Sequence, residues 1–217
     1  MRVGVAIPCY KYHLPLLKRC LDSIERQTRK PDEVVVACSS SVKSDIPAYS
    51  YSFPLRIVTR ETRHNAASNR NDAVKYLTTD IVSFFDADDV MHPQRLEAIE
   101  ASFPCDIVLH SYVEASDPQP MYETIPRLRN KLGRSPTGCA VIWEDYCAPI
   151  HHAHVSVARS VLDSVSFREG PDGYMKEDAL FCGDVLARPG CQSVYISIPL
   201  SIYYQTGCTI DDEYFKK

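Results

Sequence analysis

The sequence predicts an α/β domain with a Rossmann-like, mostly parallel central sheet that is flanked by helices. Short segments rich in Val and Ile alternate along the first 90 residues with segments whose apolar residues recur at helical spacing. The resulting order of strand, helix and strand occurs twice, which is the βαβ pattern of a parallel sheet covered on both faces. The last of these strands, Ile81–Phe85, runs directly into Asp86, Asp88 and Asp89. Sheets of this kind bind ligands beyond the carboxyl ends of their strands.

Composition limits the classes of protein that need to be considered. The 217 residues are 45% hydrophobic and 24% charged, which suits one large soluble domain, alone or with a small appendage. A net charge of −4 argues against nucleic acid as a partner, and no apolar run is long enough to span a membrane. Nine cysteines without a CxxC pair indicate reduced thiols, and Met1-Arg2 leads directly into a strand. We therefore expect a cytoplasmic protein in a reducing compartment.

The first half of the chain contains most of the expected elements. Pro8 ends the first strand, and Pro31 ends a helix whose leucines share one face. The expected strands are Arg2–Ile7, Glu33–Ala37, Leu55–Thr59 and Ile81–Phe85, and the expected helices are Leu14–Lys30 and Asn65–Leu77. Neither a GxGxxG after the first strand nor a GxxxxGK[ST] is present, so the dinucleotide fingerprint and the P-loop are both absent.

The second half has weaker patterns. A helix is expected to begin near Pro93, and a strand followed by a short helix is expected within Val155–Val165. The other expected elements are the strands Asp106–Val113, Ala140–Trp143, Val194–Ile198 and Ile202–Tyr204 and the helix Asp178–Leu186.

The acidic turn after Ile81–Phe85 is the strongest chemical signal from the residues alone. Three carboxylates within four positions repel one another unless a positive charge lies between them. Mg²⁺ or Mn²⁺ prefers oxygen ligands and commonly bridges to substrate phosphates. The alternative is a solvated Asp-rich turn that caps the helix starting near Pro93.

Several motifs together resemble the family 2 glycosyltransferases of the GT-A fold. Order and spacing both match over roughly residues 2–185. The motifs are Val5-Ala6-Ile7-Pro8-Cys9-Tyr10, Asp32-Glu33-Val34-Val35-Val36, Asn69-Arg70-Asn71, Phe85-Asp86-Ala87-Asp88-Asp89 with Pro93 and Leu96, and Lys176-Glu177-Asp178-Ala179-Leu180-Phe181. The compact form also resembles glycosyltransferases of large DNA viruses of algae.

The resemblance implies a GT-A fold with a small antiparallel portion on the acceptor side. It implies an inverting transfer from a nucleotide-sugar donor to the hydroxyl of a glycan or protein-linked glycan, with a divalent metal. Residues carried over by their match to the motifs are Asp88 and Asp86 for Mn²⁺ or Mg²⁺, Asp86 also beside the donor ribose, Pro8 and Tyr10 against the nucleobase, Arg70 toward the nucleotide, and Asp178 as the catalytic base.

Two departures from the family pattern affect the donor site. The family usually has Asp-Asp-Gly-Ser where this chain has Ala37-Cys38-Ser39-Ser40. Because Cys38 cannot make a charged hydrogen bond, we expect the base contact to pass to Ser39 or to a main-chain group, with a UDP-sugar as the first choice of donor. No His occurs in Tyr203–Gly207, where similar enzymes often have one near the metal.

The acceptor side is less defined by the sequence. Three histidines lie within four positions, at His151, His152 and His154, but they lack spaced Cys or carboxylate partners for a metal. We expect His152 or His154 to face the acceptor; the alternative is a loop with one buried, hydrogen-bonded His. Glu177 is the competing candidate for the base, and apart from the resemblance Glu177-Asp178 is typical of a helix N-terminus.

The expected organisation is a single GT-A domain over residues 1–217, which can be part of a longer protein. Residues 1–90 form the nucleotide-binding half and residues 91–217 the acceptor-side half. Two other classes stay open. A nucleotidyltransferase that forms sugar nucleotides needs a basic triphosphate loop after the first strand, where only Lys11 lies. A non-catalytic module that binds nucleotide-sugars needs no base at Asp178.

Overall fold

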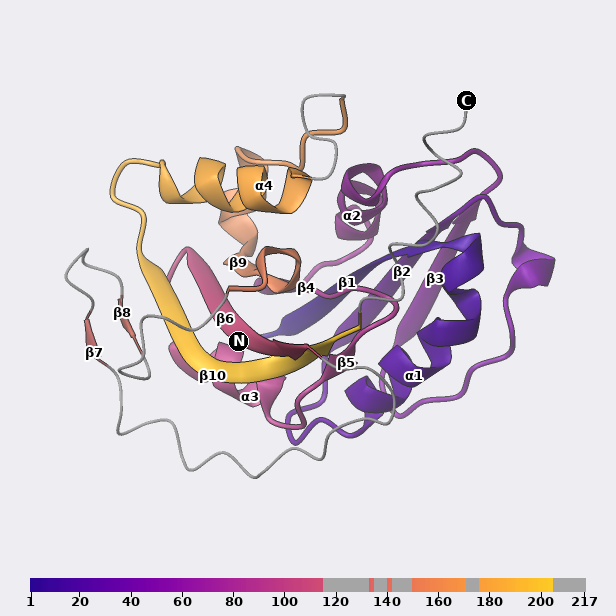
Figure 1. Ribbon diagram of the computed structural model, residues 1–217, viewed down its shortest axis with the longest axis horizontal. Coiled ribbons are helices and arrows are strands. Elements are labelled where there is room, and N and C mark those ends of the chain that lie inside the picture. The colour runs from indigo at the N-terminus through magenta and orange to yellow at the C-terminus, as the bar shows by residue number, and fades with distance from the viewer. Residues whose placement is uncertain (115–132, 135–139, 142–149, 171–175, 205–217) are drawn as a thin grey trace.

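The computed structural model describes residues 1–114, 133–134, 140–141, 150–170 and 176–204. Strands of this part of the chain form one sheet, with helices over both faces (Figure 1). The strands are β1 (Val3–Tyr10), β2 (Glu33–Ser39), β3 (Leu55–Arg60), β4 (Ile81–Phe84), β5 (Val90–Met91), β6 (Ile107–Glu114), β7 (Gly133–Arg134), β8 (Ala140–Val141), β9 (Ser156–Ala158) and β10 (Ser193–Tyr203). The helices are α1 (Leu14–Glu25), α2 (Ala66–Val74), α3 (Arg95–Ser102) and α4 (Glu177–Leu186), with 3₁₀ turns at η1 (Lys11–His13), η2 (Lys43–Asp45), η4 (His152–His154) and η5 (Arg159–Asp163).

The sheet is mostly parallel, as the sequence predicted. Its order is β3-β2-β1-β4-β9-β6-β10-β8-β7, and β5 pairs with β10. The pairs β1–β2, β2–β3, β1–β4, β6–β10 and β8–β10 are parallel. The short strand β9 runs antiparallel to both of its neighbours, β4 and β6. It therefore joins the strands β1 to β4 to the later strands β6 and β10 across a reversal of direction.

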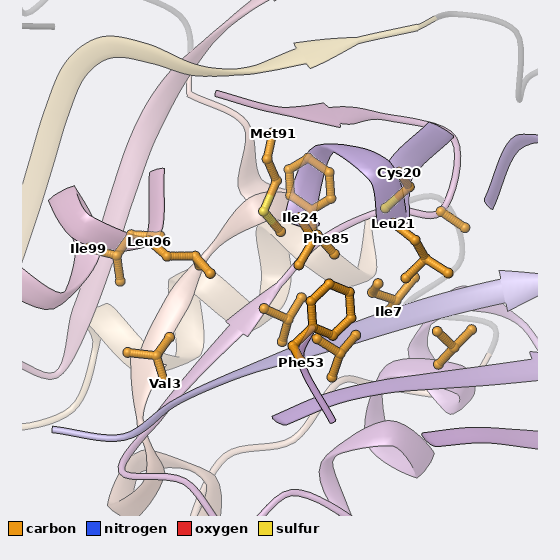
Figure 2. Close-up of a cluster of buried hydrophobic side chains, with 14 of the residues drawn as sticks. Val3, Ile7, Cys20, Leu21, Ile24, Phe53, Phe85, Met91, Leu96 and Ile99 are labelled. Atoms are coloured by element: carbon orange, nitrogen blue, oxygen red, sulfur yellow. The ribbon is translucent and has the colours of Figure 1, made fainter. Parts of the chain in front are cut away.

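One face of the sheet is covered by α1 and α3. Their apolar side chains pack on alternate residues of β1, β2 and β4 (Figure 2). Figure 2 shows Leu21 and Ile24 of α1 beside Ile7 and Phe85, with Leu96 of α3 farther along the same layer. Because successive strand residues point to opposite faces, the intervening residues pack on the other side of the sheet.

The second face is covered by α2 and α4. Ala6 and Val82 of the sheet pack there. An aromatic stack extends this layer, with ring centroids of Phe84 and Phe167 4.8 Å apart and those of Phe167 and Phe181 4.0 Å apart. Burial on both faces explains why the central strands are continuously apolar rather than alternating.

The predicted helix Leu14–Lys30 is wrong at its C-terminal end. Helix α1 ends at Glu25 because the residues that follow bond to other elements. The Gln27 side chain donates to the carbonyl of His92 at 2.7 Å and accepts from the backbone N–H of Leu96 at 3.0 Å. Thr28 donates its backbone N–H to Pro93. Gln27 and Thr28, which follow α1, therefore hydrogen-bond to the residues around the start of α3.

The two late strands expected at Val194–Ile198 and Ile202–Tyr204 are one strand, β10. Its pairing with β6 shifts register on either side of Pro199, which cannot donate to the ladder. The strand continues through this irregularity because β5 pairs with it at Ser201 and Ile202. Of the expected strand Ala140–Trp143, residues 140–141 form β8, and the rest lies outside the described residues.

This topology gathers the candidate site at one edge of the sheet. The carboxyl ends of β1, β2 and β4 meet there because these strands are parallel. Since β9 is antiparallel to β4, the residues that precede β9 lie beside those that follow β4. Phe84 accordingly donates its backbone N–H to Val155 at 2.9 Å. No helix in the described part of the chain has the length and apolar composition that a membrane crossing requires.

Candidate active site

The acidic turn follows β4 as predicted, but its three carboxylates have different environments. The Asp86 side chain is 21% exposed, Asp88 is half-buried, and the Asp89 side chain is fully buried at 0%. The turn closes with the backbone N–H of Asp89 on the Asp86 carbonyl at 3.4 Å. Arg19 of α1 donates to the carbonyl of Asp88, and its guanidinium carbon lies 3.8 Å from the Tyr204 ring centroid.

Electrostatics within the turn favour a cation. Burial, with the charge of Asp86, raises the pKa of Asp88 above its usual value. Burial, with the charges of Asp88 and Asp86, raises the pKa of Asp89 well above its usual value. Full ionisation of all three groups is therefore unfavourable without a positive charge nearby. Asp86 and Asp88 offer only oxygen ligands, which fits a hard divalent ion such as Mg²⁺ or Mn²⁺.

Arg70 of α2 connects the acidic turn to the start of α4. Its side chain is 3% exposed. Nη2 donates to Asp86 Oδ1 at 2.8 Å, and Nη1 donates to Glu177 Oε1 at 2.9 Å. Although burial opposes its charge, the carboxylates of Asp86 and Glu177 raise the pKa of Arg70. Arg70 therefore stays charged and holds two predicted site residues in one arrangement.

Glu177 and Asp178 form the first turn of α4, as the sequence predicted. Glu177 is engaged by Arg70, whereas the Asp178 carboxylate accepts the backbone N–H of Ala179 at 2.7 Å through Oδ1. Asp178 is half-buried, and its charge contributes to the raised pKa of Arg70. The two adjacent carboxylates thus have separate roles. Glu177 pairs with a buried cation, while Asp178 lies beside that pair.

His151 and His154 lie against the acidic turn. Their rings stack at 3.7 Å with an interplanar angle of 2°. His154 Nε2 lies 3.0 Å from Asp89 Oδ2 and 4.0 Å from Asp86 Oδ2, and His151 Nε2 lies 3.7 Å from Asp89 Oδ2. Burial lowers the pKa of His151 to about 4 and lowers that of His154 well below its usual value. Both imidazoles are therefore neutral near pH 7.

The sequence indicated a role for His154 but not its carboxylate partner. The expectation that these histidines lack a carboxylate is wrong, because Asp89 reaches them from across the sheet. The missing signal is the antiparallel pairing of β4 with β9, which nothing local encodes. His152, the other predicted acceptor-side residue, is half-buried at the start of η4 and is not part of this group.

Arg95 supports the turn from beneath, a role that no motif in the sequence predicts. This fully buried side chain donates through Nη2 to the carbonyls of Phe84 at 3.2 Å and His154 at 2.6 Å. Nη1 donates to Ser83 Oγ at 2.7 Å, and Nε donates to His110 Nε2 at 3.0 Å. One guanidinium therefore ties the end of β4 to the segment that precedes β9.

The predicted nucleobase residues lie at the ends of β1 and β2. The prediction that Pro8 ends the first strand is wrong, because β1 stays paired with β2 through Tyr10. Pro8 is buried within β1, and Tyr10 is half-buried at its end, with the guanidinium carbon of Arg63 5.4 Å from its ring centroid. Cys38 packs into the apolar layer under α1, where it is only 1% exposed. A hydrogen bond from the Cys9 thiol is the main cause that lowers the pKa of Cys38 to about 7.

Ser39 lies on the opposite face of the sheet from Cys38. Its hydroxyl donates to the His64 carbonyl at 3.3 Å and accepts from Asn69 Nδ2 at 3.0 Å. The next residue, Ser40, has a φ of +55°, the left-handed region that favours glycine. The end of β2 therefore turns sharply one residue after Ser39.

Comparison with known proteins gives a consistent assignment for the N-terminal half. The model of glycosyl transferase family 2 matches residues 4–104, which run from β1 through α3. An uncharacterized glycosyltransferase of Haemophilus influenzae is 30% identical over 99 residues, or 45% of this chain and 33% of the relative. The amylovoran biosynthesis glycosyltransferase AmsE of Erwinia amylovora is 31% identical over 99 residues, or 43% of this chain and 37% of the relative. The chain thus matches about a third of the length of these relatives.

Solved structures extend the likeness to nearly the whole chain. Staphylococcus aureus TarS, residues 1–349 in complex with UDP, superposes with a TM-score of 0.68 at 16% identity, covering 98% of this chain and 63% of TarS. The mannosyltransferase PcManGT from Pyrobaculum calidifontis, in complex with GDP-Man and Mn²⁺, has a TM-score of 0.62 at 21% identity, covering 93% of this chain and 56% of PcManGT. The GT-A fold expected from the sequence is confirmed, and the family match and the relatives support a glycosyltransferase enzyme.

Proposed function

We propose that this chain transfers a sugar from a nucleotide-sugar donor, a UDP-sugar in the first place, to an acceptor hydroxyl of a glycan or protein-linked glycan. The transfer is metal-dependent and inverts the anomeric carbon. One observation carries the proposal: buried Arg70 binds both Asp86 and Glu177, so the acidic turn and the first turn of α4 lie side by side. A structure of TarS 1–349 in complex with UDP-GlcNAc and that of PcManGT in complex with GDP-Man support the same class of donor.

The donor's diphosphate would lie against the acidic turn. Asp88 and Asp86 would hold Mn²⁺ or Mg²⁺, and their mutual repulsion is the feature of this chain that favours such an ion. When bound, the ion acts as a Lewis acid that neutralises charge on the departing nucleoside diphosphate. Arg70 keeps Oδ1 of Asp86 occupied, and Oδ2 of Asp86 lies 4.0 Å from His154 Nε2.

Asp178 would act as the general base. An alcohol is a poor nucleophile until its proton leaves, and a positioned carboxylate can accept that proton. Glu177 is unsuited to this role because its charge is already paired with Arg70. Attack by the activated hydroxyl from the face opposite the leaving group transfers the sugar with inversion.

The nucleobase would lie between the ends of β1 and β2, against Pro8 and Tyr10. The alignment of the family's Asp-Asp-Gly-Ser with Ala37-Cys38-Ser39-Ser40 is replaced here by one shifted by one residue, to Cys38-Ser39-Ser40-Ser41, which puts the glycine at the left-handed position, Ser40. Ser39 rather than Cys38 then stands where the family has its second Asp. The polar contact to the base would pass to Ser39, and Cys38 would serve packing.

The two alternative classes have less support. A nucleotidyltransferase would need basic groups for a triphosphate after β1, and Lys11 is instead paired with Asp45 at 3.2 Å. A non-catalytic module would give no reason for an accessible carboxylate next to an engaged one at the start of α4.

Six described cysteines are free thiols, which supports the proposal of a reducing compartment such as the cytoplasm.

A donor screen tests the proposal directly. Purified protein with Mn²⁺ is incubated with UDP-, GDP- and dTDP-sugars, and released nucleotide is measured in the absence of acceptor. We expect slow hydrolysis of one donor class, abolished by EDTA and by Asp178→Asn. Asp184→Asn is the matched control, because Asp184 lies on the same helix in an ion pair with exposed Arg168. Hydrolysis that persists undiminished in Asp178→Asn would contradict the assigned base.

A further inference from the structure

Asp89, His151 and His154 form a compact polar group beneath the acidic turn. One ligand atom of each residue lies within 4.8 Å of the others. Asp89 and His154 are fully buried, and His151 is nearly so. We propose that this group is a transition-metal site, separate from the oxygen-only Asp86 and Asp88 pair. The proposal goes beyond the transferase activity and does not depend on it.

Distances within the group suit a single small ion. Bonds of about 2.0–2.1 Å at tetrahedral angles place two ligand atoms roughly 3.3 Å apart. The separations from Asp89 Oδ2 are 3.0 Å to His154 Nε2 and 3.7 Å to His151 Nε2, one on each side of that value. The two imidazole rings are stacked and parallel, and both Nε2 atoms lie within 3.7 Å of the same carboxylate oxygen.

Two of the three ligand atoms lack a hydrogen-bond partner among the described residues. Asp89 Oδ2 and His154 Nε2 are both buried, and although they are 3.0 Å apart they are not aligned as a hydrogen bond. Buried polar atoms are nearly always paired in folded proteins, so two facing exceptions call for a shared partner. A cation between them supplies that partner for both atoms at once.

The opposite atoms of the same side chains are held in place. His154 Nδ1 lies 2.8 Å from Ser201 Oγ, and Asp89 Oδ1 accepts the backbone N–H of Tyr204 at 2.8 Å. Both partners belong to β10 or follow it directly. Second contacts of this kind fix the ring orientation and the carboxylate, which is how metal ligands are commonly positioned.

Ligand chemistry selects the class of ion. Two neutral imidazoles with one carboxylate favour Zn²⁺, Co²⁺, Ni²⁺ or Fe²⁺ over Mg²⁺, which prefers oxygen ligands. Three protein ligands leave at least one coordination position open. Asp86 Oδ2 is an acidic neighbour of the group, 4.0 Å from His154 Nε2. The site thus adjoins the donor pair but differs from it in ligand type and burial.

Co²⁺ is a suitable probe because its visible absorption reports nitrogen ligation and coordination number. The full chain is stripped with a chelator and titrated with CoCl₂. We expect one Co²⁺ per chain with absorption typical of four or five ligands, displaced by Zn²⁺ but not by excess Mg²⁺. His151→Gln should weaken binding by more than about tenfold, and Ser201→Ala by about 10- to 100-fold through loss of the outer contact.

Two controls separate this site from its surroundings. His152→Ala changes a histidine of the same segment that lies outside the group, and Asp88→Asn changes the neighbouring donor carboxylate. Both should keep Co²⁺ binding within about threefold of the native chain. Circular dichroism confirms that each variant is folded, and His151→Gln is chosen because His151 is the least buried ligand.

Three results would overturn the proposal: no Co²⁺ binding by the native chain, undiminished binding by His151→Gln, or equal loss in Asp88→Asn. The last would mean that one shared ion lies between the two groups. If the native chain binds Co²⁺ as expected but hydrolyses no donor, the proposed transferase function fails and the proposed metal site stands.

Discussion

The two sides of the acidic turn differ in what surrounds them, although Asp88 and Asp89 are adjacent in the chain. On the outer side, Asp86 and Asp88 are partly exposed and lie near cationic groups at Arg70 and Arg19. On the inner side, Asp89 is fully buried and faces two neutral imidazoles. Adjacent carboxylates of one motif can therefore have different functions, because burial and the groups in contact with each carboxylate determine what it can bind. We expect the outer side to control Mn²⁺- or Mg²⁺-dependent donor binding and turnover, and the inner side to control stability and transition-metal binding.

The largest expected effect concerns catalysis on the outer side. Asp178→Asn keeps size and shape but removes the proton acceptor, so kcat should fall by about 10²–10⁴ while donor affinity stays nearly unchanged. Steady-state kinetics with the donor found by screening provides the measurement. Glu177→Gln should cost less, through displacement of Arg70. A dead Glu177→Gln beside an active Asp178→Asn would reverse the two roles.

The second effect concerns stability on the inner side. Arg95→Met removes the buried donor to the carbonyls of Phe84 and His154 and leaves both with fewer partners. We expect the free energy of unfolding to fall by about 3 kcal/mol or more. Chemical denaturation measures it. Arg2→Met, at an exposed ion pair with Glu33, serves as the control and should cost less than about 1 kcal/mol. Equal costs would show that the buried network adds nothing.

The third effect separates the neighbouring carboxylates by their response to metal. Asp88→Asn should weaken Mn²⁺-dependent binding of a nucleoside diphosphate by more than about tenfold, about 1.4 kcal/mol. The fold should remain intact, because Asp88 is half-buried. Calorimetric titration of UDP with Mn²⁺ or with EDTA tests this. The idea fails if native affinity is the same under both conditions.

The smallest effect concerns the end of β2. Ser39→Ala removes one hydroxyl from the proposed base contact and should weaken UDP binding by about 1 kcal/mol, the usual net value of a neutral hydrogen bond. Cys38→Ala changes the core-facing neighbour and should lower stability without changing UDP affinity. A reversed pattern would restore Cys38 as the residue that faces the base.

Local sequence was sufficient for the N-terminal half of the fold and for most candidate site residues. Strands β1 to β4, helix α2 and the acidic turn follow from short-range periodicity, a cap at Asn65 and the charges after Phe85. Glu177 and Asp178 were likewise found because a helix N-terminus has a local signature. The alternation of side chains along β2 also predicts that Cys38 faces the core, because it lies two residues beyond Val36 on the same face.

Only the tertiary structure decided which distant residues meet. Strand β9 inserts antiparallel between β4 and β6, and this single placement brings His151 and His154 to Asp89, more than 60 positions away in the chain. The buried Arg95 network and the early end of α1 at Glu25 depend on the same long-range packing. Hydrophobic periodicity and turn preferences depend on residues that are neighbours in the chain, so short segments of sequence are enough to predict them. The order of distant strands and the reversed direction of β9 depend on packing between segments far apart, and no local pattern specifies them.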